Sequence, residues 1–216
     1  MKCWIIIGIL ACSLCATAQE KKYSIVFLNK KEASDKLSPE ETKRIMDGHM
    51  ANMGRLSKEG KLLAAGPFEG GGGIFIMSSA STAEVEEWIS TDPGIQAKRW
   101  DVEILPYIPR HGGVCPVGEE YTMVHYSFVR FDAIVSKFTA GNQGNLMAQH
   151  NDYLKKVIAT GNVVTEAIFG ESDGGIMILK GDVDSDLVQG DPAVREGLIE
   201  TQIKKLYIAQ GSFCEQ

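Results

Sequence analysis

The stretch SPEETKRIMDGHMANMGRLSKEGKLLAAGPF (residues 38–68) contains a helix followed by the start of a strand, and its pattern recurs later in the chain. Ser38 is a favourable N-cap residue, and Glu41 three residues later completes a capping box, so a helix is expected to begin here. Gly60 is expected to end it, because glycine readily adopts the backbone conformation found just after helix C-termini. The apolar residues 62–65 then predict a strand.

The sequence on either side of this stretch completes one α+β unit. The expected strands are 23–29, 62–65, 74–78 and 102–107, and the expected helices are 38–59 and 81–89. This β-α-β-β-α-β order is the ferredoxin-like arrangement, in which both helices cover one face of a four-stranded antiparallel sheet. One such unit leaves the other face of its sheet bare.

A second copy of the unit follows, because an ordered series of matches relates residues 23–115 to residues 121–214. The matched pairs are Tyr23 with Tyr121, His49 with His150, Gly60 with Gly161, Phe68 with Phe169, Gly73 with Gly175, Asp92 with Asp191, Tyr107 with Tyr207 and Cys115 with Cys214. The second copy predicts strands near 121–129, 162–168, 174–180 and 201–208, and helices near 144–160 and 183–189. A period near 100 residues indicates tandem domains and not a solenoid.

The predicted fold class is therefore α+β, with two tandem ferredoxin-like βαββαβ units packed sheet to sheet as an intramolecular α+β barrel, a pseudo-dimer within one chain. The predicted boundaries are 1–18 for a signal peptide, 19–108 for the first unit, 109–119 for a linker and 120–216 for the second unit. The linker contains three glycines and two prolines in residues 109–118, which is typical of a connecting segment.

The N-terminus has the composition of a signal peptide. Lys2 provides the positive charge, residues 4–14 are apolar, and Ala16-Thr17-Ala18 fits a small-x-small cleavage site. The apolar run is too short for a permanent membrane-spanning helix, and no other segment is apolar enough. We expect a periplasmic or secreted protein, and processing as a lipoprotein anchored at Cys12 stays open as the minor alternative.

Two cysteines remain after cleavage, in a compartment where disulfides persist. Cys115 and Cys214 follow equivalent last strands, so a disulfide between them could join the linker to the C-terminus. Two free thiols are the alternative, because equivalent positions need not be adjacent ones.

The residues from His49 to Phe68, with Gly-Lys-Leu at 60–62 and Gly-Pro at 66–67, resemble the YCII-related family of the dimeric α+β barrel superfamily. Asp92-Pro93 resembles the family's Asp-Pro after the second helix. The resemblance is looser over 121–208, where Ala167-Ile168 replaces Gly-Pro. It implies a site built from a His/Asp pair. It also implies kinship with muconolactone isomerase-like and chloromuconolactone dehalogenase-like enzymes, although fold alone fixes no reaction.

Both histidines lie on the apolar stripe of their helices. In the first copy this stripe is Ile45, His49, Met53 and Leu56; in the second it is Leu146, His150, Leu154 and Val157. An inward, neutral imidazole held by an acid can act as a general base, so His49, Asp92, His150 and Asp191 are the candidate catalytic residues. Two plainer interpretations stay open. Each His could be a core residue bonded to a backbone carbonyl, and each Asp-Pro could simply begin a short helical turn.

Other residues give weaker indications. Gly66, Pro67 and His125 are candidates to line a pocket, since His125 aligns with the apolar Phe27. Residues 70–73 are rich in glycine but join two strands and lack the Lys-Ser/Thr of a phosphate loop, so they predict a hairpin. The four histidines show no metal-site spacing, so no metal and no cofactor are expected.

The net charge of −6 and the absence of a basic patch argue against a nucleic-acid-binding protein. Two functions remain. One is a small-molecule enzyme of the cell envelope, of the isomerase, lyase or dehalogenase type, that needs no redox cofactor. The other is a non-catalytic ligand-binding or structural module. The expected partner is a small organic ligand, and the expected state is a monomer or a weak homo-oligomer, with no integral membrane segment after processing.

Overall fold

A computed structural model of the chain describes residues 22–31, 37–118, 120–139, 141, 143–170, 174–183 and 185–214. The predicted signal peptide, with Lys2, Cys12 and the cleavage site, lies outside these residues. The first half of the chain contains β1 (Tyr23–Lys30), α1 (Pro39–Lys58), β2 (Leu62–Pro67), β3 (Gly73–Met77), α2 (Thr82–Ile89), α3 (Pro93–Gln96) and β4 (Trp100–His111). The second half contains β5 (Gly113–Val114), β6 (Met123–Ala133), η1 (Val135–Lys137), α4 (Gln143–Ile158), β7 (Val163–Ile168), β8 (Gly174–Leu179), α5 (Ser185–Gln189), α6 (Pro192–Arg195), β9 (Ile199–Ala209) and β10 (Phe213–Cys214).

Helix α1 begins with the capping box that the sequence predicts. The hydroxyl of Ser38 accepts from the backbone N–H of Glu41 at 3.2 Å, and the carboxylate of Glu41 accepts from the N–H of Ser38 at 3.1 Å. Pro39 occupies the first turn, where its missing N–H costs nothing. Gly60 follows with a positive φ of 69°, which a glycine adopts without strain.

The strands form one eight-stranded antiparallel sheet in the order β2-β3-β1-β4-β7-β8-β6-β9. Each half contributes four strands in the same internal order, so the α+β class with ferredoxin-like halves is confirmed. The halves are joined edge to edge, because β4 pairs with β7. The two ends of the sheet also meet, where Phe68 bridges Leu206 and the N–H of Glu69 donates to the carbonyl of Lys205. The sheet thus closes into a barrel.

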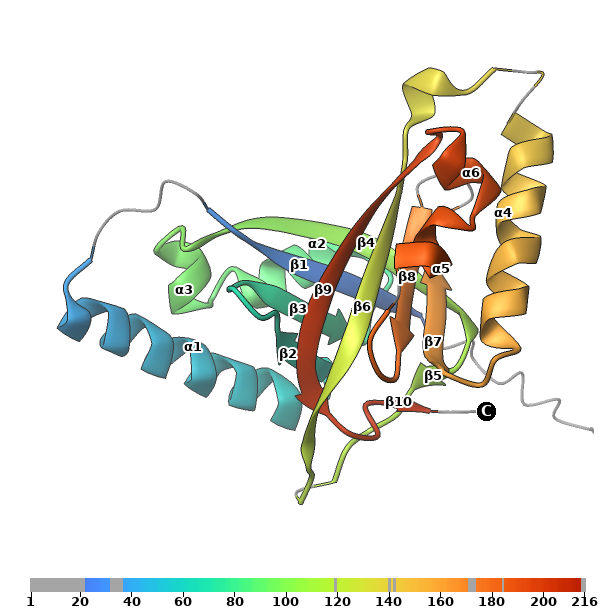
Figure 1. Ribbon diagram of the computed structural model, residues 1–216. Helices are drawn as coiled ribbons and strands as arrows, with labels where there is room; N and C mark the ends of the chain where they lie inside the picture. The colour runs from blue at the N-terminus through green and yellow to red at the C-terminus, as the bar shows by residue number, and fades with distance from the viewer. Residues whose placement is uncertain are drawn as a thin grey trace, which may run out of the picture.

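Three apolar clusters fill the molecule in layers. The cluster inside the barrel draws residues from both halves, among them Phe27, Tyr107, Phe128 and Phe169. The other two clusters lie outside the barrel, one between the first half's sheet and its helices and one between the second half's sheet and α4 to α6. Figure 1 shows α1 and α4 on opposite sides of the strands. Any residue on the inward stripe of α1 therefore faces the outer surface of the sheet, and the barrel interior lies on the sheet's other side.

The strand registers show which positions of the two halves are equivalent. Ser24 pairs with Met77 and donates to the carbonyl of Ser79, while Ser127 pairs with Leu179 and donates to the carbonyl of Gly181. Ser127 is thus the structural counterpart of Ser24. The sequence alignment that matches Tyr23 with Tyr121 would make Thr122 the counterpart of Ser24. That alignment is therefore wrong by five residues in this strand. The similar Tyr-x-x-Val patterns caused the shift.

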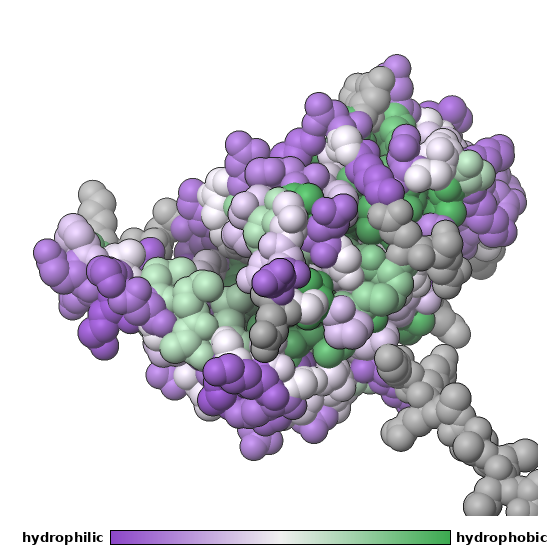
Figure 2. Space-filling model, turned by 90° about the horizontal axis from the view of Figure 1, so that it is seen from below, coloured by the Kyte–Doolittle hydropathy of each residue, from purple (hydrophilic) through white to green (hydrophobic). Residues whose placement is uncertain are grey.

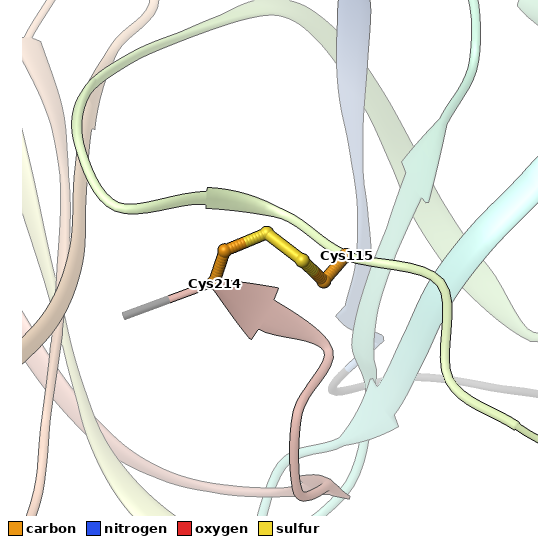
Figure 3. Close-up of a disulfide and its surroundings, with 2 residues drawn as sticks. All are labelled: Cys115 and Cys214. Atoms are coloured by element: carbon orange, nitrogen blue, oxygen red, sulfur yellow. A yellow bond between two sulfur atoms is a disulfide. The ribbon is translucent and has the colours of Figure 1, made fainter. Parts of the chain in front are cut away.

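A short ribbon of β5 and β10 ends both halves, and a disulfide joins it. Cys115 and Cys214 are bonded, with their Cα atoms 5.3 Å apart, within the usual range for disulfides. Figure 3 shows the bond linking the segment after β5 to the end of β10. Val114 and Phe213 next to it are buried in the cluster inside the barrel. The ribbon therefore packs against the barrel interior and ties the linker to the C-terminus.

The molecular surface mixes apolar and hydrophilic regions. Figure 2, the view from below, shows pale apolar surface next to strongly hydrophilic surface at the side where α1 lies. Met50 on α1 is the most exposed large apolar residue described there, at 60%.

Among the described residues, no helix combines the length and apolar character that crossing a membrane requires.

Candidate active site

Helix α1 places His49 against the outer face of the sheet. The buried residues of α1 are Ile45, His49, Asn52 and Leu56, which follow one another at helical spacing. The sequence predicts Met53 in this stripe, whereas Asn52 is the buried residue and Met53 is only partly buried. A polar side chain on a buried helix face needs a hydrogen-bond partner. That partner is part of the His49 site.

Asp92 is the partner of His49. Nδ1 of His49 lies 3.0 Å from Oδ1 and 2.9 Å from Oδ2 of Asp92, and both side chains are buried. Asp92 is also the N-cap of α3, since its Oδ1 accepts from the backbone N–H groups of Gly94 at 2.8 Å and Ile95 at 3.2 Å. The capping role and the His partnership, which the sequence leaves compatible with each other, occur together.

Asn52 adds a third group to this carboxylate. Its Nδ2 donates to Oδ2 of Asp92 at 3.1 Å. Its Oδ1 accepts from the guanidinium of Arg55 at 2.9 Å and from the hydroxyl of Thr91 at 3.1 Å. These two donors fix the orientation of the amide, so its N–H points at Asp92. The sequence offers one signal for Asn52, a polar residue one helical turn after His49, but residue spacing alone does not reveal Arg55 and Thr91.

The electrostatics of Asp92 favour its ionised form. Burial raises its pKa, but the hydrogen bond and the charge of His49 lower it, as do Asn52 and the N–H of Ile95, and the net result is a lowered pKa. An ionised carboxylate can only accept hydrogen bonds, so Nδ1 of His49 carries a proton and donates it. In the neutral ring, Nε2 then has a free lone pair.

Aromatic side chains enclose the imidazole. The ring of Phe75 stacks on it with centroids 5.9 Å apart, and the ring of Trp100 lies at 4.9 Å. Gly94 lies against Trp100 so closely that a Cβ there would be 2.4 Å from the indole ring. The turn after Asp92 therefore needs glycine for the indole to cover the site. The side chain of His49 keeps 7% of its surface exposed.

The second pair has a simpler environment. Nδ1 of His150 lies 2.5 Å from Oδ2 of Asp191, whose Oδ1 accepts from the N–H of Ala193 at 2.9 Å as the cap of α6. Tyr153 occupies the position equivalent to Asn52, and its hydroxyl donates to the carbonyl of Leu187 at 2.7 Å. No amide supports this carboxylate among the described residues, so the two pairs are not equivalent.

The remaining candidates lie away from the pairs. Gly66 is buried at the barrel seam, where a Cβ would lie 2.6 Å from the carbonyl of Tyr207, and Pro67 is exposed. His125 is exposed and packs on the ring of Tyr207 at 4.6 Å, so its predicted inward position is wrong. The reason is the shifted alignment, because the residue equivalent to Phe27 is Arg130.

A surface pocket of about 510 Å³ lies at the linker, away from both pairs. It is lined by Pro116, Val117, Gly118, Glu120, Tyr121, Thr122, Gln210 and Gly211.

Within the described part of the chain, no three His, Cys, Asp or Glu side chains converge as metal ligands would. Each His/Asp pair has the contact between Nδ1 and a carboxylate that proton transfer at Nε2 requires.

The comparison with family models now identifies the first half. Residues 22–108, which include His49 and Asp92, match the model of the YCII-related domain. The first half of this chain is a YCII-related domain. No protein of curated function matches the sequence significantly.

Solved structures resemble this chain in fold. A candidate chlorite dismutase has a TM-score of 0.50 and 9% sequence identity, and the match covers 88% of this chain and 94% of that one. A candidate monooxygenase from Fusobacterium nucleatum has a TM-score of 0.46 and 8% identity, covering 90% of this chain and 97% of that one. At 9% identity, the likeness to the candidate chlorite dismutase concerns the fold alone.

Proposed function

We propose that this protein is a cofactor-independent enzyme in which His49 and Asp92 perform acid–base chemistry on a small organic substrate. The observation that carries the proposal is the buried contact between Nδ1 of His49 and Asp92, at 2.9 Å to Oδ2. This contact keeps the proton on Nδ1, so Nε2 can accept a proton from a substrate. The carboxylate then stabilises the imidazolium that results.

The reaction class follows from a single base paired with a carboxylate. Nε2 can remove a proton from a carbon next to a carbonyl group and return it at another position, which is an isomerisation. If a leaving group departs instead, the same first step gives an elimination, as in a lyase or a dehalogenase. Lactones and halogenated lactones contain such acidified C–H bonds, so we select them as test substrates.

The first pair is the working site in this proposal. Asn52, Arg55 and Thr91 hold the Asp92 carboxylate in one orientation, and general-base catalysis depends on such positioning. Asp191 has no counterpart of this network among the described residues. We therefore assign His150 and Asp191 a structural role, in which the carboxylate caps α6 and satisfies the buried imidazole.

We further propose that the chain arose by tandem duplication and is exported. Two YCII-like units, 19–108 and 120–216, would be joined by the linker 109–119. The identical strand order within the halves and the two His–Asp pairs support the duplication. A signal peptide at residues 1–18 would deliver the protein to the periplasm or the exterior, and the disulfide is in keeping with an oxidising compartment.

The alternative function is a ligand-binding or structural module without catalysis. The near-complete burial of both imidazoles favours it, since each side chain is only 7% exposed. A substrate would need part of the aromatic enclosure to move before it could reach Nε2. In the module, each pair would serve packing and capping only.

A substrate screen with matched variants tests the proposal. Wild type, His49→Ala and His150→Ala are incubated with lactones and halogenated lactones, and product formation and ligand-dependent thermal shifts are measured. We expect turnover in wild type and His150→Ala and its loss in His49→Ala. Turnover that survives His49→Ala contradicts the proposal. The absence of both turnover and thermal shift in all three proteins favours the module.

A further inference from the structure

A second polar cluster lies on the inner face of the barrel, on the opposite side of the sheet from His49. Arg130 on β6 and Lys204 on β9 point to the same side as the core residues Phe128 and Leu206. Glu103 on β4 and Asp132 on β6 complete this cluster, which we call the barrel-end cluster. Its side chains are partly exposed, 36% for Glu103, 29% for Asp132 and 13% for Arg130, so solvent reaches them.

Arg130 is paired with both carboxylates of the barrel-end cluster. Its guanidinium binds both oxygens of Glu103, at 2.6 and 2.9 Å, and its Nε donates to Asp132 at 2.6 Å. It also lies over the ring of Phe27, 4.4 Å from the centroid. Because Glu103 belongs to the first half and Arg130 to the second, this ion pair connects the halves. A structural role therefore accounts for these residues.

No structural role of this kind accounts for the charge of Lys204. Its ammonium lies over the ring of Phe68, 4.8 Å from the centroid, and among the described residues it has no carboxylate within ion-pair distance. Burial lowers its pKa, and the charge of Arg130 lowers it further, against a smaller opposite effect of Asp132. The protein thus keeps a cation where its own surroundings disfavour the charge, and residues so placed are often functional.

The first half of the chain shows that the fold does not require this charge. By strand register, the counterpart of Lys204 is Leu105, and the counterpart of Arg130 is Phe27. Leu105 packs against the barrel core, so an apolar side chain fills this position well. A lysine at this position buries less apolar surface than a leucine would. We take this loss as a sign that the ammonium has a role other than packing.

We propose that the barrel-end cluster is a binding site for a small monocarboxylate with an apolar or aromatic body, with Lys204 as the counter-ion. One unpaired ammonium matches one carboxylate. Glu103 and Asp132 flank the position and repel an anion of higher charge, which disfavours dicarboxylates and phosphate. Gln202, exposed two residues before Lys204 on the same face of β9, donates one amide N–H to Asp132 at 3.3 Å, and its second N–H can bind the carboxylate of the ligand. This site is independent of the proposed chemistry at His49.

The test is an NMR titration of the lysine side chains with sodium benzoate, acetate, succinate and phosphate at constant ionic strength. The Lys204→Leu variant identifies the Lys204 signal by its loss, and it should fold, because Leu105 fills the equivalent position. Lys205→Leu is the matched control, since Lys205 is the next residue and pairs with Asp182 and Ser127. We expect saturable shifts of Lys204 with benzoate, weaker binding of acetate, and the weakest binding of succinate and phosphate.

The benzoate affinities of Lys204→Leu and Lys205→Leu distinguish the possible outcomes. Isothermal titration should show benzoate binding at least about tenfold weaker in Lys204→Leu, a loss of ~1.4 kcal/mol, and unchanged in Lys205→Leu. Equal benzoate affinity in wild type and Lys204→Leu would overturn the proposal. So would a Lys204 shift no larger than that of Lys205, or a preference for phosphate over benzoate.

Discussion

Asp92 illustrates at the residue scale how one carboxylate serves two purposes. It caps α3 through Gly94 and Ile95 and binds His49, with no exposed surface. Asp92→Asn keeps the shape of the side chain but leaves His49 without its anionic partner. Removing the charged partner of a buried group lowers the free energy of unfolding by about 1–3 kcal/mol. We expect a drop of that size in the free energy of unfolding, measured by urea denaturation at pH 7. Wild-type stability in Asp92→Asn would contradict the assignment.

The lowered pKa of Asp92 predicts a pH dependence with a definite sign. Because the folded-state pKa lies below the unfolded value of ~3.9, the ionised carboxylate stabilises the protein at pH values above the unfolded pKa. This contribution is lost as the pH falls through the folded-state pKa. We therefore expect the stability difference between wild type and Asp92→Asn to be full at pH 6 and to shrink below about pH 4. A constant difference down to pH 2 would show that another group is responsible.

Asn52 provides a test of positioning at the same scale. Asn52→Leu has similar volume but removes the amide that donates to Asp92, while Arg55 and Thr91 keep other acceptors in Glu59 and the carbonyl of Trp88. A hydrogen bond to a charged group is worth about 1.5–3 kcal/mol, so we expect activity to fall about 10- to 100-fold. At a single pH, the imidazole NMR resonances of His49 should move while those of His150 stay fixed. Tyr153→Phe is the control in the second half and should leave His49 unchanged.

At the element scale, the seam between β2 and β9 depends on close approach of backbones. A Cβ on Gly66 would lie 2.6 Å from the carbonyl of Tyr207 and 3.0 Å from the side chain of Leu206. Gly66→Ala must therefore push the strands apart, and we expect a loss of about 1–3 kcal/mol in the free energy of unfolding. Gly54→Ala on α1 is the control, because nothing lies within 4 Å there and alanine favours a helix. Equal stability of the two variants would mean that the seam is not tight.

The elements also show what local sequence signals can predict. The capping box of α1, the Gly60 stop and the short turns after both Asp-Pro pairs are encoded within a few residues, and the structure confirms them. The first strand of the second half was misplaced, because its register is set by pairing with β8 and β9 and not by its own residues. Spacing identified His49 and Asp92 but not Arg55 and Thr91, because their roles depend on the side-chain orientation of Asn52, which is set where α1 packs against the turn before α3.

At the scale of the whole molecule, the disulfide should contribute strongly to stability. Cys115 and Cys214 are 99 residues apart, and closing a loop of that length restricts the unfolded chain by about 4–5 kcal/mol in the chain-entropy model. We expect the double variant Cys115→Ser/Cys214→Ser to unfold at lower denaturant concentration by a corresponding amount. Reductant should weaken the wild type to the same level and leave the double variant unchanged. A wild type that is insensitive to reductant would contradict this.

The barrel was only partly predictable at this scale. Apolar periodicity tells which face of a strand is buried, so it indicated that each bare sheet face would be covered by the other half. It carries no information on which strand edges pair. The joining of β4 to β7, and the contact of Phe68 with Leu206 that closes the sheet, therefore became visible only in three dimensions.

This closure has a consequence for synthesis on the ribosome. The first half emerges with two open strand edges, on β2 and β4, and their partners lie on β7 and β9, which are translated later. Until residues near 206 have left the exit tunnel, the nascent chain presents edges that could pair with a neighbouring chain on the same messenger. The addition of β9, the last strand of the eight-stranded sheet, therefore determines whether the chain completes its own barrel or pairs with another chain.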